Sequence, residues 1–278
     1  MPWKASLVRR ILNHAQQHRR GAGKLARACE QYLACYNNHD YRMDRNGEFR
    51  LLELLRPFNP QVLFDVGANR GEWTEAAHRL LNPRSIHAFE IAPSMAAELR
   101  ARFQGEPDVV VNDFGLSDVA ENVEIDFYLD GAHTGTTMLT SDHVHDSSPK
   151  LRQNARVERG DDYCLRQGIE SIDLLKIDVE GVEPKTLGGF TGLFERGKIG
   201  VVQFEYNSIN ITSRHLLRDF YQFFERYGFA VGKLWAHGVS FGPYDFKEEN
   251  FRGPNYVALH ESRSAMKQAL TYLPVRAR

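Results

Sequence analysis

Hydrophobic residues in this chain occur in short continuous runs that alternate with runs of helical spacing. The continuous runs predict buried strands, and the spaced runs predict amphipathic helices. Strands are predicted at 61–66, 85–90, 109–112, 172–177, 199–205, 229–235 and 255–260. Helices are predicted at 72–81, 93–103 and 216–227. This alternation is typical of a doubly wound, largely parallel α/β sheet, whose ligands bind outside the carboxyl ends of the strands.

An insertion interrupts the alternation after the third strand. Residues 121–130 alternate apolar and polar positions, as the strands of a half-exposed β-hairpin do. The polar stretch 130–150 has no periodicity and predicts a lid loop. A further strand near 156–158 and a short helix after 161–162 precede the apolar strand at 172–177.

Composition limits the classes of function. The 278 residues suffice for one sizeable domain with extensions, and 35 Lys and Arg against 36 Asp and Glu leave a net charge of −1. No global charge therefore recruits nucleic acid. No apolar run is long enough to span a membrane, and no secretory signal is predicted. The three cysteines have no metal-ligand spacing, which favours a reducing, cytoplasmic location.

The N-terminal segment has a charge pattern of its own. Residues 1–29 contain seven Lys and Arg and no acidic residue, and Trp3, Leu7, Ile11 and Leu12 are near helical spacing. This predicts a basic amphipathic helix. One interpretation is peripheral attachment to an anionic membrane surface. The other is a helix packed over the core with its basic face in water.

The most informative motif is the turn Asp65-Val-Gly-Ala-Asn-Arg-Gly71, which follows an apolar strand and precedes a helix. Gly67 and Gly71 allow the backbone to approach a ligand closely, and Asn69 tolerates a positive φ. Asp65 adds a charge that can face the amine of a ligand. The alternative is a tight strand-to-helix turn without a ligand.

Glu90 ends the next predicted strand, 25 positions after Asp65 (90 − 65). Sheets that bind adenosine place a carboxylate there, where it accepts both ribose hydroxyls. Nicotinamide and S-adenosylmethionine (SAM) enzymes share this spacing, and a helix-capping acid also accounts for it.

A second motif, Lys176-Ile-Asp-Val-Glu-Gly-Val-Glu183, ends the strand at 172–177. It gathers Lys176, Asp178, Glu180 and Glu183 around the end of a buried strand. Such charges must pair, bind a ligand or metal, or reach water, because isolated buried charges cost several kcal/mol. The alternative is a Lys176–carboxylate pair that only holds the turn.

The chain resembles the FkbM-type SAM-dependent methyltransferases over about residues 45–235. The resemblance rests on the two motifs together with Phe89-Glu90, Asn112 and Leu116-Ser-Asp118. The resemblance implies a seven-stranded, Rossmann-like SAM-methyltransferase sheet and SAM as cofactor. It implies O-methylation of a hydroxyl on a sugar, glycan or secondary metabolite. The predicted division is a helical extension (1–45), a methyltransferase domain (46–262) and a C-terminal tail (263–278).

The resemblance also assigns residues to the cofactor. Gly67, Ala68, Asn69 and Gly71 would hold the methionine end of SAM, with Asp65 near its amino group. Glu90 would bind the ribose, and Asn112 and Asp113 would approach the adenine. Asp178 would lie near the methyl group and the acceptor hydroxyl. Arg70 stands where the family more often has an apolar residue.

A base or a metal is expected beside the acceptor, because a protonated alcohol is a poor nucleophile. Our hypothesis is that Asp178 is the base, or shares Mg²⁺ or Mn²⁺ with Glu180 or Glu205. Glu205 ends the strand expected beside that of Asp178; alternatively it pairs with Lys176 or binds a substrate hydroxyl. Tyr206 and Asn207, directly after it, are candidate substrate contacts.

Two other functions fit parts of the pattern. An NAD(P)-dependent oxidoreductase would share the glycine turn and Glu90, but hydride transfer does not need the acidic strand end at Asp178. A non-catalytic scaffold with the same fold, anchored by the basic N-terminal helix, is the second alternative.

Overall fold

The computed structural model describes residues 2–128, 136–137 and 150–273. The chain forms two compact units, Met1–Tyr41 and Arg42–Arg278. The first consists of helix α1 (Pro2–Gln16) and helix α2 (Ala22–Tyr36), with Gly21 at a φ of 89° just before α2. The division predicted at residue 45 falls close to the boundary between these units.

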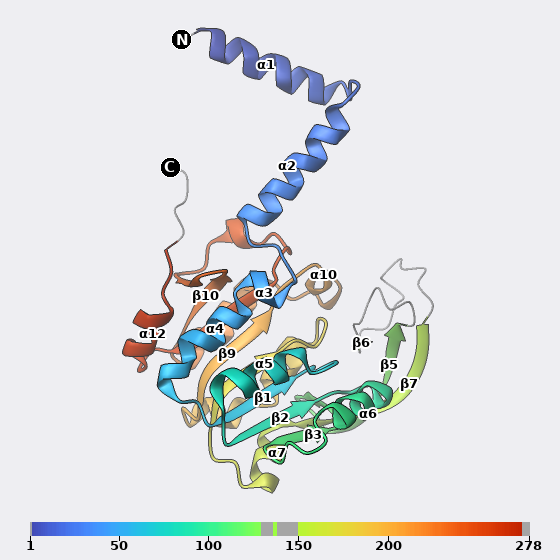
Figure 1. Cartoon of the computed structure of the whole chain (residues 1–278), viewed down its shortest axis with the longest axis vertical. Helices are drawn as coiled ribbons and strands as arrows, with labels where there is room; N and C mark the ends of the chain where they lie inside the picture. The colour runs from blue at the N-terminus through green and yellow to red at the C-terminus, as the bar shows by residue number, and fades with distance from the viewer. Residues whose placement is uncertain (1, 129–135, 138–149, 274–278) are drawn as a thin grey trace. The chain divides into compact units, whose positions relative to one another are not determined.

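The second unit contains an eight-stranded sheet in the order β11-β10-β12-β9-β8-β1-β2-β3 (Figure 1). Its strands are β1 (Val62–Val66), β2 (Ser85–Phe89), β3 (Val109–Asn112), β8 (Ile172–Ile177), β9 (Ile199–Glu205), β10 (Phe229–Trp235), β11 (Gly238–Phe241) and β12 (Asn255–His260). β12 runs antiparallel to both of its neighbours, β9 and β10. The predicted α/β fold class is confirmed. The sheet has one strand more than the seven predicted, because β11 pairs with the outer edge of β10.

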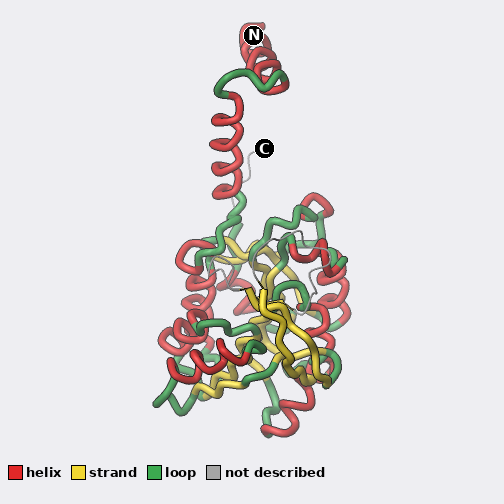
Figure 2. The backbone as a smooth tube through the Cα atoms, turned by 90° about the vertical axis from the view of Figure 1, so that its right-hand side faces the viewer, coloured by secondary structure: helices red, strands yellow, loops and turns green. Residues whose placement is uncertain are grey.

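Helices cover both faces of this sheet (Figure 2). One face packs against α4 (Glu48–Leu55), α5 (Glu72–Leu81), α6 (Pro93–Arg102) and α12 (Ser264–Leu270). The other packs against α7 (Gly160–Gln167), α8 (Glu183–Gly188), α9 (Thr191–Glu195) and α11 (Leu217–Arg226). Strand alternation divides β1 between the two cores, since Phe64 enters one and Leu63 the other. The segment predicted as a C-terminal tail begins with α12, whose Met266 and Leu270 are buried.

The remaining elements are short or belong to the insertion. A four-stranded sheet has the order β4-β7-β5-β6, formed by β4 (Gly115–Ser117), β5 (Glu121–Tyr128), β6 (Thr136–Thr137) and β7 (Lys150–Arg159). β7 extends the short strand predicted near residues 156–158. Apart from β6 and the start of β7, the predicted lid over 130–150 lies outside the described residues. The short helices are α3 (Met43–Asn46), η1 (Arg56–Phe58), α10 (Ile209–Ser213) and η3 (Phe246–Glu248).

Strand order reverses between β1 and β8, since β2 and β3 lie on one side of this pair and β9 on the other. In doubly wound sheets, ligands bind outside the carboxyl ends of the strands at such a switch point. Among the described residues, no helix has the length and apolar character needed to cross a membrane. Cys29 and Cys35 are exposed and Cys164 is buried, all with free thiols, and the reducing location stays a prediction.

Candidate functional site

The turn after β1 has the backbone geometry that its residue types predict. Gly67, Asn69 and Gly71 have φ values of 82°, 49° and 80°. The N–H groups of Gly67 and Ala68 both donate to the carbonyl of Phe89, at 3.0 and 2.9 Å, which ties the turn to the end of β2. A Cβ on Gly67 would collide with the carbonyl oxygen of Asp178. The turn therefore lies directly against the end of β8.

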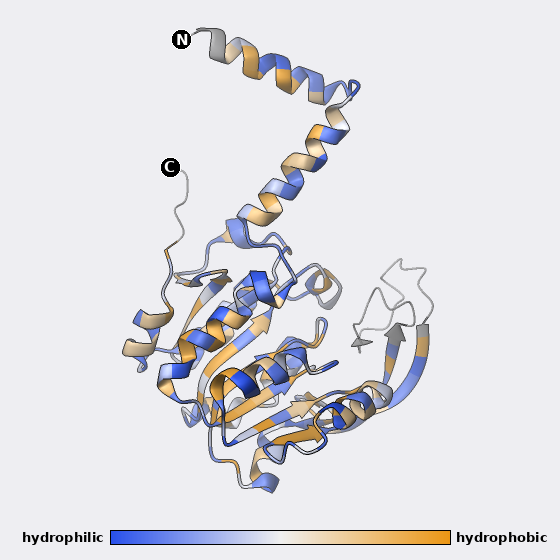
Figure 3. Cartoon of the chain, in the orientation of Figure 1, coloured by the Kyte–Doolittle hydropathy of each residue, from blue (hydrophilic) through white to orange (hydrophobic). Residues whose placement is uncertain are grey.

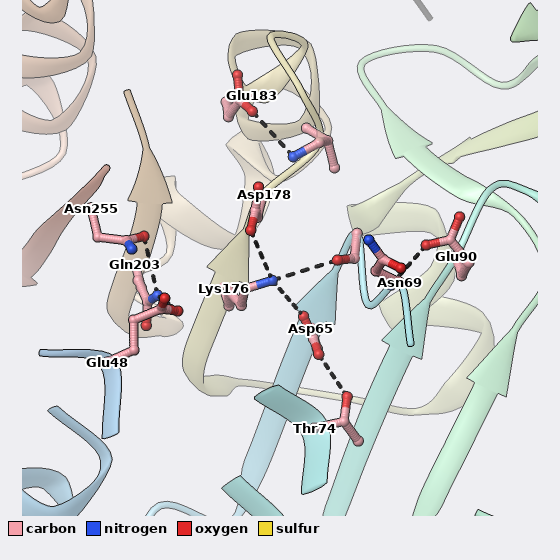
Figure 4. A network of polar contacts seen from close by, with 12 residues as sticks. Glu48, Asp65, Asn69, Thr74, Glu90, Lys176, Asp178, Glu183, Gln203 and Asn255 are labelled. Atoms are coloured by element: carbon pink, nitrogen blue, oxygen red, sulfur yellow. Dashed lines mark hydrogen bonds and ion pairs between the residues drawn. The ribbon is translucent and has the colours of Figure 1, made fainter. Parts of the chain in front are cut away.

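A row of polar side chains crosses three adjacent parallel strands at their carboxyl ends. Asp65 on β1 is in register with Lys176 on β8, and Lys176 is in register with Gln203 on β9. Partners in register on parallel strands point to the same face, here the one covered by α4 and α5. The Nζ of Lys176 lies 3.1 Å from Oδ1 of Asp65, 3.4 Å from Oδ2 of Asp178 and 3.5 Å from the carbonyl oxygen of Gly67 (Figure 4).

Asp65 has no exposed surface, and both of its oxygens have partners inside the protein. Lys176 binds one oxygen, and the hydroxyl of Thr74 on α5 donates to the other at 2.6 Å. Burial alone would lower the pKa of Lys176, but the carboxylates of Asp65, Asp178 and Glu48 outweigh it and raise this pKa above its usual value. Lys176 is therefore a permanent cation that links the glycine turn to Asp178.

A second polar network extends this row and was not anticipated from the sequence. The side-chain amide of Gln203 donates to Glu48 on α4 at 2.7 Å and to Asn255 on β12 at 3.3 Å. Asn46 donates to the other oxygen of Glu48 at 2.7 Å. Burial raises the pKa of Glu48. The signal available in the sequence was the two-residue spacing of Gln203 and Glu205 within an apolar strand, which puts both side chains on one face.

Four carboxyl groups gather beyond the end of this row. They belong to Asp178, Glu180, Glu183 and Glu205. Burial raises the pKa of Glu205, and the negative charges of the other three carboxylates raise it further. Asp178 has 38% of its side chain exposed, and Glu180 is half-buried. Glu183 and Glu205 are buried, and in the described part of the chain Oε2 of each has no hydrogen-bond partner. The three carboxyl groups for which the sequence predicts convergence, those of Asp178, Glu180 and Glu205, thus interact electrostatically, and Glu183 interacts with them.

Burial and mutual repulsion make this cluster hold protons near neutral pH. Burial raises the pKa of Glu180 to about 8, and the carboxylates of Asp178 and Glu183 act in the same direction. Burial also raises the pKa of Glu183 to about 7, although its Oε1 accepts the N–H groups of Val179 and Gly181, each at 3.1 Å. Glu180 has a φ of 53°, which is uncommon for a residue with a Cβ. Such strain concentrates at functional sites.

Glu90 lies next to the turn, as its spacing from Asp65 predicts. Its two oxygens accept the N–H groups of Asn69 at 2.8 Å and Ala92 at 2.9 Å, and burial raises its pKa. The buried side chain of Asn112 donates to the carbonyls of Ala88 and Val110, both at 3.3 Å. Asp113 has 52% of its side chain exposed and forms an ion pair with Arg100 at 2.9 Å. The structure thus groups Glu90 with the turn, whereas Asp113 lies at the surface.

The distances do not support the predicted magnesium or manganese site. Throughout the described ranges, ligand atoms of three His, Cys, Asp or Glu residues approach within 4.8 Å of one another only at His78, Glu106 and Asp108. This group lies at the amino ends of the strands, away from the glycine turn. Asp178, Glu180 and Glu205 do not form such a set.

Tyr206, a candidate substrate contact, has an internal partner. Its buried hydroxyl donates to Glu249 at 2.6 Å. Glu249 also accepts the hydroxyl of Tyr244 and the N–H groups of Leu217 and Arg218. The side chain of Asn207 accepts the N–H of Ile209 at 2.8 Å. These contacts brace the segment after β9.

Comparison with known proteins identifies the family. Residues 65–231, from the first residue of the glycine turn motif into β10, match the methyltransferase FkbM domain. The chain belongs to the FkbM methyltransferase family. The match contains the glycine turn, Glu90 and the carboxyl cluster, and it confirms the resemblance that the two sequence motifs carry.

Two curated FkbM-family relatives align with about half of this chain. The 31-O-demethyl-FK506 methyltransferase FkbM of Streptomyces tacrolimicus is 32% identical over an alignment of 163 residues, which covers 49% of this chain and 60% of that protein. The 2-O-methyltransferase NoeI of Sinorhizobium fredii is 26% identical over 151 residues, 50% of this chain and 61% of that protein. The chain therefore spans about 60% of the length of these relatives.

Among solved structures, a methyltransferase FkbM from Methylobacillus flagellatus is similar over 73% of this chain and 44% of its own, with 12% identity and a TM-score of 0.45. A similarity this distant adds nothing to the assignment of individual residues.

Proposed function

We propose that this protein transfers a methyl group from SAM to a hydroxyl oxygen of a small molecule or glycan. The observation that carries this proposal is the contact between the glycine turn and the end of β8, which brings Gly67 against Asp178 at the switch point of an FkbM-family sheet. The names of both curated relatives specify an oxygen as the methylated position.

The residues at the switch point fit SAM. Gly67 and Gly71 have no Cβ, which lets the turn pack directly against the carbonyl of Asp178 and the side chains of Leu99 and Phe103. We assign Gly67, Ala68, Asn69 and Gly71 to the methionine end of the cofactor. Each oxygen of Glu90 accepts one backbone N–H and retains a second lone pair for a ribose hydroxyl. When bound, SAM supplies an electrophilic methyl group.

The other predicted cofactor residues take different roles in this proposal. Asn112 lies at the end of β3, on the side of Glu90 where the adenine would be. A contact between Asp113 and the adenine requires its ion pair with Arg100 to open. Because Asp65 has no exposed surface and its oxygens bind Lys176 and Thr74, in this proposal it does not contact the cofactor amine and instead holds these two side chains in place.

We assign the base to Asp178. Lys176 holds its Oδ2, so Oδ1 is the atom that accepts the hydroxyl proton of the acceptor. A positioned base contributes about 10²–10⁴-fold to the rate. Glu180 and Glu205, the other predicted catalytic residues, would hold protons and hydrogen-bond to further hydroxyls of the acceptor. Alignment of the hydroxyl and exclusion of water by the buried cluster supply the rest of the rate enhancement.

Charge narrows the class of acceptor. The proposed acceptor side has the carboxylate of Asp178 beside three carboxyl groups that hold protons, those of Glu180, Glu183 and Glu205. An anionic acceptor such as a phosphorylated sugar would be repelled by Asp178, and the cation beside it, Lys176, is already paired with two carboxylates. The cluster favours a neutral, polyhydroxylated acceptor, whose hydroxyls are both donors and acceptors of hydrogen bonds.

Calorimetry with S-adenosylhomocysteine tests the cofactor. The wild-type protein should bind it, and Glu90→Gln should bind about tenfold or more weakly, because a hydrogen bond to a charged group is worth about 1.5–3 kcal/mol. Glu98→Gln, an exposed position on α6, is the matched control. Binding of NADH without S-adenosylhomocysteine would favour the oxidoreductase, and binding of neither would favour the scaffold.

Incubation with SAM that carries a labelled methyl group, and with a panel of neutral polyhydroxylated acceptors, tests the reaction. Mass spectrometry should find the label on an acceptor oxygen. Removal of divalent cations with a chelator should leave the rate unchanged. If the chelator abolishes the reaction and Mg²⁺ or Mn²⁺ restores it, the metal hypothesis is correct. Asp178 would then not act as a base without a metal ion.

A further inference from the structure

The N-terminal unit exposes apolar side chains on both of its helices. On α1, Leu7, Val8, Ile11 and Leu12 are each about half exposed. On α2, the exposed apolar residues are Leu25, Tyr32, Leu33 and Tyr36. Tyr32 and Tyr36 stack on each other, with ring centroids 6.4 Å apart, but the two helices of 15 residues each leave all of these side chains about half exposed or more. Something outside the unit must cover them, because such a surface is unfavourable in water.

On α1 the exposed apolar residues share one face. Leu7 and Ile11 are four positions apart, as are Val8 and Leu12, so the four form a single stripe along a helix with 3.6 residues per turn. Arg9 and Arg10 fall on the opposite side of the same two turns. Figure 3 shows the resulting alternation of hydrophobic and hydrophilic residues along the helix.

Charge distinguishes between the surfaces that can cover this stripe. Residues 1–29 contain seven Lys and Arg and no Asp or Glu. A second copy of the same unit offers no carboxylate from this segment, so pairing two copies would bring like charges together. An anionic lipid surface offers both negative headgroups and an apolar interior. A helix with apolar residues on one face and arginines on the other can lie in the plane of that interface.

We propose that the N-terminal unit attaches this protein to an anionic lipid surface, with α1 lying in the interface. The apolar stripe of α1 enters the boundary between headgroups and acyl chains, and Arg9 and Arg10 remain among the headgroups. This proposal goes beyond the methyl-transfer reaction and does not depend on it.

Co-sedimentation of the full chain with lipid vesicles tests this attachment. The protein should sediment with vesicles of phosphatidylcholine and phosphatidylglycerol and not with vesicles of phosphatidylcholine alone. Bound protein should decrease as salt is added, because the attraction is screened. The double variant Arg9→Gln with Arg10→Gln should bind about 25-fold more weakly, or about fivefold for each arginine removed.

The apolar stripe has its own variant and control. Leu7→Gln with Ile11→Gln should abolish sedimentation, whereas Ser6→Gln with Asn13→Gln, on the polar side of α1, should not change it. Glutamine is a good helix former, so both pairs preserve the helix. S-adenosylhomocysteine binding should be equal in all variants, which checks the second unit separately.

Three results would overturn the proposal. The first is the absence of sedimentation of the wild-type chain with anionic vesicles. The second is sedimentation that the Leu7 and Ile11 substitutions leave unchanged. The third is a wild-type dimer in analytical ultracentrifugation that does not bind vesicles and that the Leu7 and Ile11 substitutions dissociate. A second copy would then cover the stripe.

Discussion

Lys176 and Asp65, 111 residues apart in sequence, form a buried ion pair with Nζ and Oδ1 3.1 Å apart. Lys176→Met leaves Asp65 as a buried charge with only the Thr74 hydroxyl beside it. Removal of one partner of a buried pair costs about 3–5 kcal/mol. We expect the free energy of unfolding, measured with urea, to fall by that amount. Lys185→Met, at an exposed position on α8, should change it by less than about 0.5 kcal/mol.

The double variant Lys176→Met with Asp65→Asn gives the complementary result. Because neither charge is then buried alone, part of the stability should return. A double variant that is as unstable as the sum of the single ones would contradict a direct ion pair.

Gly67→Ala should destabilise the protein more than Gly105→Ala. Both glycines have positive φ, 82° and 103°, so alanine is strained at each. A Cβ at Gly105 meets no atom within 4 Å, whereas at Gly67 it meets the carbonyl of Asp178. The strain common to both positions costs about 1 kcal/mol. Only the Gly67 variant should also lose S-adenosylhomocysteine binding by calorimetry, and equal melting temperatures would refute the close approach of the turn to β8.

Glu180→Gln should change how stability depends on pH. Burial raises the pKa of Glu180 to about 8 in the folded state, so the folded protein binds this proton more tightly than the unfolded chain does. The contribution of this proton to stability is therefore complete below the unfolded pKa of about 4.5 and is lost as the pH rises towards about 8. Glutamine has no such proton.

Thermal unfolding across this pH range measures the effect. The melting temperature of the wild type should fall relative to that of Glu180→Gln as the pH rises. Glu225→Gln, exposed on α11, should follow the wild type at every pH. A constant difference between the wild type and Glu180→Gln would mean that Glu180 titrates as an ordinary carboxyl.

Asp178→Asn should lose methyl transfer without losing the cofactor. The amide keeps the size of the side chain but does not accept the acceptor's proton, so the rate should fall about 10²–10⁴-fold. The affinity for S-adenosylhomocysteine, measured by calorimetry, should stay within about threefold of the wild-type value. A change of about 1.4 kcal/mol in binding free energy would correspond to tenfold. Asp162→Asn, an exposed position on α7, is the control. If the rate is unchanged, the base must be another member of the cluster.

Tyr206→Phe distinguishes a structural brace from a substrate contact. The hydroxyl of Tyr206 donates to Glu249 at 2.6 Å in a buried setting, so its loss should lower the free energy of unfolding by about 1.5–3 kcal/mol. Tyr244→Phe removes the second, more exposed hydroxyl from the same carboxylate and should cost less. A normal unfolding midpoint with a raised Michaelis constant for the acceptor would make Tyr206 a substrate contact.

Residue type alone predicted the local geometry of the turn. Gly67, Asn69 and Gly71 occupy positive φ because these residues tolerate it, and the apolar runs form the strands because they are buried on both faces. The spacing of Glu90 from Asp65 was informative because parallel strands joined by one helix end at the same edge of the sheet. Local chemistry therefore sufficed for the backbone geometry of the turn and for the place of Glu90 beside it.

Contacts between distant segments were not predictable in the same way. Gln203 meets Glu48 across 155 positions, and no local pattern gives the register that joins them. Asp65 was expected to face a ligand, but its position two residues after Leu63 places it in the core beneath α5. The alternation of side chains along the strand predicts that Asp65 is buried on the same face as Leu63. The charge of Asp65 instead favoured a position facing a ligand.

The antiparallel strand β12 has a consequence for the order of folding. It lies between β9 and β10 although it follows both in the chain, so the edge of β9 stays open until residues 255–260 have been synthesised. Asn255 is in register with Glu205, which means that the carboxyl cluster also waits for this strand. A nascent chain that ends before it would expose an unpaired edge, and such edges promote aggregation. Completion of the carboxyl cluster is thereby coupled to closure of the sheet.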